Sequence, residues 1–186
     1  ANYNVAIGNF TLCCNTTGRY NTGTGQGVLR FNNTGNHNTA MGTDALALNA
    51  VGCNSAFGSQ ALRYTTTGAH NTAMGFCALR SNTTGVYNTA VGSLSLACNT
   101  IGTRNTALGF QALKTNTTGE SNVAVGVSAL LSNTTGINNI GIGHDALVYN
   151  AGGSNNVAIG RLAMCANVSG NNNTALGYNA LRANTT

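Results

Sequence analysis

The chain has 186 residues, of which only 6% are charged, and a formal net charge of +5. Asparagine fills 30 positions, glycine 25 and proline none, while the apolar residues recur at fixed intervals, which excludes a disordered composition. No apolar run is long enough to insert into a membrane, and the positive charge reflects scarce acids, so neither membrane insertion nor specific nucleic-acid binding is predicted.

An asparagine returns at every seventeenth position through the whole chain, except that the interval before Asn54 is one position shorter. We number each repeat from this anchor asparagine, which is position 1. A short fixed period over the full length predicts a solenoid, in which each unit packs on its neighbours, so residues 1–186 are expected to form one repeat array. The anchors are Asn4, Asn21, Asn38, Asn54, Asn71, Asn88, Asn105, Asn122, Asn139, Asn156 and Asn173.

The first five positions of each repeat predict a short strand that ends in a bend. Position 2 is Val, Thr, Ser or Ile, position 3 is always Ala or Gly, and position 4 is apolar except at Thr24. This alternation is typical of a strand with one very small face and one bulkier face. Position 5 is Gly in all eleven repeats, which indicates a positive φ or a close approach that a Cβ would block.

The second half of the repeat contains another apolar column and a polar corner. Position 9 is Leu in ten repeats and Met164 in the other, and position 8 is usually Ala. We predict a second short strand here, followed by a turn, because Asn and Gly tolerate left-handed backbone and Thr hydroxyls can cap local amides. The corner reads Asn-Thr-Thr-Gly at 15–18, 82–85, 116–119 and 133–136.

Two short strands and two bends in each repeat predict an all-β fold, a parallel β-solenoid of eleven seventeen-residue coils, of which one is a residue shorter. At an inter-strand spacing of about 4.8 Å the rod would be roughly 50 Å long. The stacked anchor asparagines could pass amide hydrogen bonds from coil to coil. The interior remains open between two alternatives. We favour position 4 and the Leu as the core, but the Ala/Gly face could lie inside, with the bulkier face against another chain.

The two ends of the chain continue the repeat in register. Ala1, Asn2 and Tyr3 fill positions 15 to 17, and the chain stops at Asn184-Thr185-Thr186, one residue short of the expected Gly. We therefore expect either a window of a longer array or copies that stack end to end, and both are filaments.

The repeat spreads like groups along an axis, whereas catalysis requires unlike groups to converge. Asp44 and Asp145 share a position but lie six repeats apart, and His37 and His70 lie two apart. The Gly23–Gly27 segment lacks the lysine of a phosphate-binding loop. No enzyme activity, metal site or cofactor is predicted. No two cysteines share a position in adjacent repeats, so free thiols or bonds between chains are expected rather than an internal disulfide ladder.

Two further sets of residues fall at fixed positions. We expect the basic residues at position 10 to form a solvated stripe that prevents lateral association of rods. They are Arg30, Arg63, Arg80, Lys114 and Arg182. Asparagines followed by the N-x-T or N-x-S pattern are candidate glycosylation sites on surface turns: Asn15, Asn32, Asn82, Asn116, Asn133, Asn167, Asn172 and Asn184.

The segments VAIG at 5–8 and 157–160 and VAVG at 123–126 resemble the head repeats of trimeric autotransporter adhesins, the YadA-like head. The stretch NNVAIG at 155–160 is closest to that pattern, and similar N-T-A-x-G-x-x-A-L arrays occur in phage, viral and bacterial surface fibres. The resemblance implies a left-handed parallel β-roll, three chains side by side and attachment to a surface.

These observations favour a structural protein, namely an extracellular fibre or adhesin shaft on a cell or virion surface. Its partners would be further copies of itself, end to end or as a trimer, and glycans or a host surface. The alternative is a solenoid that binds ice or a polysaccharide through stacked Thr pairs such as Thr83-Thr84 and Thr117-Thr118.

Overall fold

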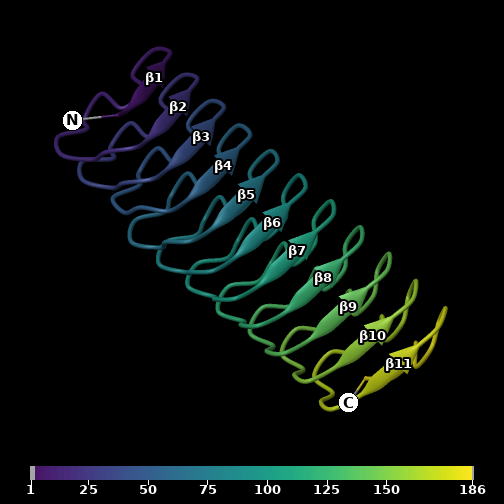
Figure 1. Cartoon of the computed structure of the whole chain (residues 1–186). Helices are drawn as coiled ribbons and strands as arrows, with labels where there is room; N and C mark the ends of the chain where they lie inside the picture. The colour runs from purple at the N-terminus through teal and green to yellow at the C-terminus, as the bar shows by residue number, and fades with distance from the viewer. Residues whose placement is uncertain (1–2, 186) are drawn as a thin grey trace.

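The computed structural model describes residues 3–185 as one row of stacked coils, with the two ends of the chain at opposite ends of the row (Figure 1). The expected joining of the ends involves Ala1, Asn2 and Thr186, which lie outside the described residues. Eleven strands form one parallel sheet in chain order, and no helix occurs in residues 3–185. The strands are β1 (Val5–Ile7), β2 (Thr22–Thr24), β3 (Thr39–Met41), β4 (Ser55–Phe57), β5 (Thr72–Met74), β6 (Thr89–Val91), β7 (Thr106–Leu108), β8 (Val123–Val125), β9 (Ile140–Ile142), β10 (Val157–Ile159) and β11 (Thr174–Leu176). The predicted all-β parallel solenoid is confirmed.

Each strand residue pairs with the residue at the same position of the next repeat, and this register is kept across the repeat that is one residue shorter. In the ordinary case Ala73 of β5 pairs with Ala90 of β6, its equivalent in the next repeat. The shortening is confined to the corner, where the carbonyl of Val51 takes the place of the corner glycine carbonyl. That oxygen accepts from Nδ2 of Asn38 at 2.8 Å and from Nδ2 of Asn49. The missing residue therefore shortens a surface turn and leaves the sheet aligned.

The second predicted strand is wrong, because the segment around the Leu is bent rather than extended. Its backbone still bonds to the next coil, since the N–H of Leu62 donates to the Ala78 carbonyl at 3.0 Å and that of Tyr64 to the Arg80 carbonyl at 3.1 Å. However, Leu62 has a φ of 51° and Gln60 a φ of 60°. Left-handed residues at alternate positions curve the chain while every second N–H still points along the rod.

Left-handed residues recur at positions 7, 9 and 17 of the coils, and almost all of them carry side chains. The φ of the position 9 residue lies between 47° and 53°, from Leu181 to Leu147. An L-residue in this region costs about 1–2 kcal/mol. Full burial of a Leu or Met side chain contributes about 1.5–3 kcal/mol, which offsets that cost. The strain is thus placed where the side chain enters the core.

Two bends of the repeat need Gly for different reasons. At position 5, Gly75 has a φ of 140°, and an added Cβ would lie 2.5 Å from the Gly92 carbonyl oxygen of the next coil. At the corner, Gly119 has no positive φ, but its Cβ would lie 2.5 Å from the Gly136 oxygen. The corner is bent as predicted, and its Gly is needed because stacked coils approach closely there, without a left-handed φ.

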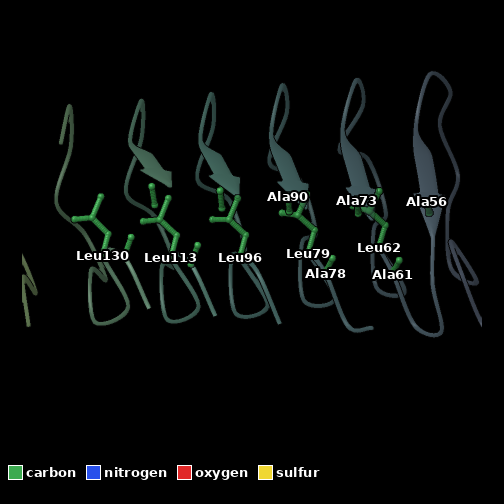
Figure 2. Close-up of a cluster of buried hydrophobic side chains, with 14 of the residues drawn as sticks. Ala56, Ala61, Leu62, Ala73, Ala78, Leu79, Ala90, Leu96, Leu113 and Leu130 are labelled. Carbon is green, nitrogen blue, oxygen red and sulfur yellow. The ribbon is translucent and has the colours of Figure 1, made fainter. Parts of the chain in front are cut away.

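The core is a thin strip of Ala and Leu that runs the length of the rod (Figure 2). Ala at position 3 of the strand packs against Ala at position 8 and Leu at position 9, and Ala90, Ala112 and Leu113 are fully buried. A Cβ added at Gly23 would already lie 2.8 Å from the Thr11 methyl group. The large position 4 residues point outward instead, with Met41 52% and Leu108 48% exposed. The favoured interior was wrong at position 4, since the Leu column leaves room for nothing larger than a methyl group opposite.

The division between inner and outer Leu residues gives a direct test. Leu96→Ala removes a fully buried side chain, so the free energy of unfolding should fall by about 2–5 kcal/mol. The matched control, Leu48→Ala, truncates an exposed side chain outside position 4 and should change the free energy of unfolding by no more than about 0.5 kcal/mol. Urea unfolding followed by circular dichroism measures both, and equal losses would contradict the assignment of the core.

Candidate functional site: two asparagine ladders and the outer surfaces

The anchor asparagines form one ladder along the rod. The Oδ1 of Asn105 accepts the backbone N–H of Asn122 in the next coil at 3.0 Å, and its Nδ2 donates to the corner carbonyl of Gly119 at 2.8 Å. Because a backbone N–H only donates and a carbonyl only accepts, these contacts fix which end of the amide is oxygen. The same N–H to Oδ1 bond joins all ten successive pairs from Asn4 to Asn173, with lengths of 2.8 to 3.0 Å.

The corner asparagines at position 12 form a second ladder, which the sequence analysis missed. The Nδ2 of Asn116 donates to Oδ1 of Asn99 in the preceding coil at 2.7 Å and to the Gly119 carbonyl at 3.0 Å. The Gly119 oxygen therefore accepts from two asparagines, the anchor and the corner of its own coil, which closes the coil. The signal was present in the sequence, since ten of the eleven repeats carry the corner residue: Asn15, Asn32, Asn49, Asn82, Asn99, Asn116, Asn133, Asn150, Asn167 and Asn184.

The corner ladder is broken at a single coil, where Thr65 replaces the asparagine. Thr65 is fully buried, and its hydroxyl has no hydrogen-bond partner among the described residues. The bonds run from Asn15 to Asn49 and again from Asn82 to Asn184, so Thr65 separates two continuous runs. This coil directly follows the short one, which makes the region around residues 49–68 the least well bonded corner.

Seven of the eight candidate glycosylation sites belong to this ladder. Asn32, Asn82, Asn116, Asn133 and Asn167 are fully buried, and Asn15 and Asn184 are partly buried. Their Nδ2 atoms, to which a glycan would be attached, donate hydrogen bonds to a corner carbonyl, to a neighbouring Oδ1 or to both. The folded coil leaves no space for a sugar at the buried positions. Only Asn172, at position 17, is exposed.

In the corners that carry two consecutive threonines, the two side chains serve different purposes. The hydroxyl of the first donates to the carbonyl of position 13 in the next coil, as from Thr83 to Thr100 at 3.0 Å and from Thr117 to Thr134 at 3.0 Å. That hydroxyl is therefore used within the stack. The second threonine, such as Thr84 or Thr118, is exposed. In each pair only the second hydroxyl is free to donate to a ligand, which halves the donor array that the ice or polysaccharide hypothesis could use.

Three of the five basic residues of position 10 lie against aromatic rings. The guanidinium carbon of Arg30 lies 5.1 Å from the ring centroid of Phe10 and 5.0 Å from that of Phe31. Arg63 and Arg80 each lie 5.2 Å from the centroid of Tyr64. These contacts are in the range of cation–π interactions and order the long side chains. The row is thus more structured than the solvated stripe expected from the sequence.

The remaining reactive side chains do not converge. His37 stacks on Tyr20 with ring centroids 4.9 Å apart. Nδ1 of His144 lies 2.8 Å from Oδ2 of Asp145. In residues 3–185 no group of three His, Cys, Asp or Glu side chains could hold a metal ion, and no pocket is hollowed into the surface. Asp44 and Asp145, the two aspartates that share a position, stay in coils far apart along the row.

All six cysteines lie in the described part of the chain and are free thiols. Cys13 and Cys14 are neighbours in sequence with sulfurs 3.6 Å apart, and the contact with Cys13 raises the pKa of the Cys14 thiol. Burial raises the pKa of Cys77, an effect that Arg80 and Arg63 partly oppose. Neither thiol is shifted towards the reactive thiolate form.

The geometry defines the chain as a parallel β-solenoid, and comparisons with known proteins add no family to that description. The chain was compared with protein-family profiles, curated protein sequences and solved structures, and none matched. Within residues 3–185 there is also no helix with the length and apolar character needed to cross a bilayer.

Repair of the corner ladder should stabilise the protein. In Thr65→Asn the new amide can join Asn49 to Asn82 and donate to the Gly68 carbonyl. The free energy of unfolding should therefore rise by about 1 kcal/mol or more. Thr67→Asn makes the same change at an exposed corner position and should have an effect of about 0.5 kcal/mol at most. Thermal and urea unfolding of protein produced in bacteria measure both. A destabilised Thr65→Asn variant would show that the gap has another cause.

The buried corner amides should carry no glycan in folded protein. If the chain is secreted from a eukaryotic host, peptide mass spectrometry of the soluble product should find Asn116 and Asn133 unmodified, because their Nδ2 atoms are buried and bonded. Among the eight candidate sites any occupancy should be at Asn172, and Asn172→Gln should remove it; the Asn9-Phe10-Thr11 sequence, whose Asn9 is exposed, lies outside this set and is scored separately. Glycosylated Asn116 in protein with an intact β-sheet spectrum would contradict this prediction.

Proposed function

We propose that this solenoid is the shaft of an extracellular fibre or adhesin at the surface of a cell or virion, and that its work is mechanical. Support comes from the way its polar groups are used. Backbone amides, two asparagine ladders and the first corner threonines all bond from coil to coil. Such bonding gives a stiff rod that can extend by adding coils, and it leaves no converging groups for catalysis.

The single observation that carries the proposal is the exposed apolar face of the sheet. Position 4 presents a large apolar residue in ten of the eleven strands, and Met41, Met74 and Leu108 are 45–52% exposed. No strand carries a charge at position 2 or position 4. Monomeric proteins rarely expose a continuous apolar strip of this extent, which instead marks an interface.

Further copies of the same chain fit this face best. The strip is straight, follows the rod axis and repeats at the coil spacing of about 4.8 Å, so a parallel copy would meet it at every coil. We propose a homo-oligomer whose sheets face one another, with three chains as the resemblance to trimeric adhesin heads implies. The bulkier face would then form a second core between chains.

The alternative function is recognition of ice or a crystalline polysaccharide by threonine rows, and only the second threonine of each pair has a hydroxyl free to donate to such a ligand. Those threonines lie in turns, and Ala151-Gly152 interrupts the row. Absence of thermal hysteresis in the purified protein would remove the ice-binding form of this alternative.

The oligomer is tested by charging its proposed interface. Sedimentation velocity should show an oligomer for the unmodified chain and a monomer for the Met74→Glu/Leu108→Glu double variant, because two buried carboxylates per chain cannot be desolvated without partners. Electron micrographs should show rods with an axial repeat of about 4.8 Å.

The matched control is Thr84→Glu/Thr118→Glu, which adds the same charge at exposed corner positions and should leave the oligomer intact. Circular dichroism confirms that each variant is folded. An unmodified chain that stays monomeric at every soluble concentration would overturn the proposed assembly.

A further inference from the structure

Five of the eight basic side chains stand in one row along the coils, on the segment that faces the sheet across the core. We call this set the basic row. Its members occupy position 10 of the second, fourth, fifth, seventh and eleventh coils: Arg30, Arg63, Arg80, Lys114 and Arg182. At about 4.8 Å per coil, the first four charges are separated by steps of about 10, 5 and 10 Å.

Aromatic stacking orders three of the five members of the basic row before any ligand binds. Tyr64 holds Arg63 and Arg80 together, since both guanidinium carbons are 5.2 Å from its ring and Nη2 of Arg80 donates to its hydroxyl at 3.4 Å. Arg30 is held between Phe10 and Phe31. A stacked guanidinium has already lost much of its rotamer freedom, so binding an anion costs it less.

Acidic residues neutralise little of this charge. Asp44 forms an ion pair with Arg63 at 3.4 Å, and it is the only acid that pairs with the basic row in residues 3–185. Glu120 lies at position 16, while Asp145 pairs with His144 two coils beyond Lys114. The row therefore keeps an excess of positive charge along one line of the rod.

We propose that the basic row binds a linear anionic polysaccharide that lies along the rod axis. Sulfate and carboxylate groups match the planar donor fork of Arg, which can bind them in a bidentate manner. One sugar of an extended polysaccharide is about as long as the coil spacing of about 4.8 Å, so charges repeated along the chain can meet successive coils in register. The ligand needs no pocket, because each contact lies on the surface of a straight rod.

A polysaccharide fits the row better than a single-stranded nucleic acid. Proteins that bind single strands combine a basic groove with bare aromatic faces on which bases stack. Here guanidinium groups occupy the rings of Tyr64 and Phe31, and no groove accompanies the row in residues 3–185. The proposal is independent of oligomer formation, because the row is on the segment opposite the apolar sheet face.

The experiment compares two triple variants that remove the same charge. The test variant is Arg63→Gln/Arg80→Gln/Lys114→Gln, and the matched control is Arg19→Gln/Arg104→Gln/Arg161→Gln, whose exposed residues lie outside the row. Fluorescence anisotropy measures binding of labelled dextran sulfate and polygalacturonate, with neutral dextran as the blank. At about 0.1 M salt we expect the test variant to bind about tenfold more weakly than the unmodified chain.

The control variant should stay within about threefold of the unmodified chain, since its charges occupy other positions of the coil and salt screens exposed charges over about 10 Å. Arg63→Lys/Arg80→Lys keeps the charge but loses the planar stack, and we expect intermediate binding. Circular dichroism and thermal unfolding establish that all variants are folded.

Three results would overturn the proposal. Equal weakening by the test and control variants would show attraction by net charge alone. No binding of either polyanion by the unmodified chain at low salt would show that the row is not a site. Tighter binding of a labelled oligodeoxythymidine, lost in the test variant, would assign the row to nucleic acid instead. Sedimentation of the same samples reports the oligomer separately, so failure of one proposal is distinguishable from failure of the other.

Discussion

The hydrogen bond from each anchor N–H to the Oδ1 of the preceding anchor is the contact on which this structure depends. It passes a polar interaction from coil to coil without interruption, and the same amide uses its nitrogen to close its own coil at the corner carbonyl. Buried polar groups are tolerated only when they are satisfied, and here the buried anchor amides are satisfied by the coil itself and its neighbours. A coil therefore has a complete set of partners only inside a stack, which makes stacking and folding the same event.

The thin core follows from this arrangement. Strands of three residues bury at most one small side chain each, so the coil has little apolar area to offset conformational entropy. The Leu of position 9 supplies most of that area, although its backbone is left-handed in every described coil. Strain and burial are coupled at one residue, so a substitution that relieves the strain by removing the side chain also removes the core. The large position 4 residues cannot help because the space opposite is already filled.

Sequence periodicity was sufficient to predict the architecture and the strand positions, since so short a period permits few other folds. The reason for the position 5 glycine was also predictable, because both of its explanations apply at Gly75. What failed was the direction of side chains and the shape of the Leu segment. Alternation at positions 2 to 4 has the same pattern whichever face lies inside, and a Leu with a positive φ has no sequence signature. The ladder role of the corner asparagines was missed because a hydrogen-bond ladder and a glycosylation pattern both place Asn before Thr.

Two ladders in one coil provide redundancy, and the third and fourth coils show what it permits. There Val51 replaces a corner glycine, one residue is missing and Thr65 replaces a corner asparagine, so the second ladder is interrupted. The anchor ladder continues through the defect, with the Asn54 N–H bonded to Asn38 at 3.0 Å and the Asn71 N–H to Asn54 at 2.9 Å. Of the two ladders only the anchor ladder spans this point, where pairing of β3, β4 and β5 also keeps the register. Because the frame tolerates loss of one ladder, the outward positions are freer still to vary, and differences between coils can encode what the rod binds without altering how it stacks.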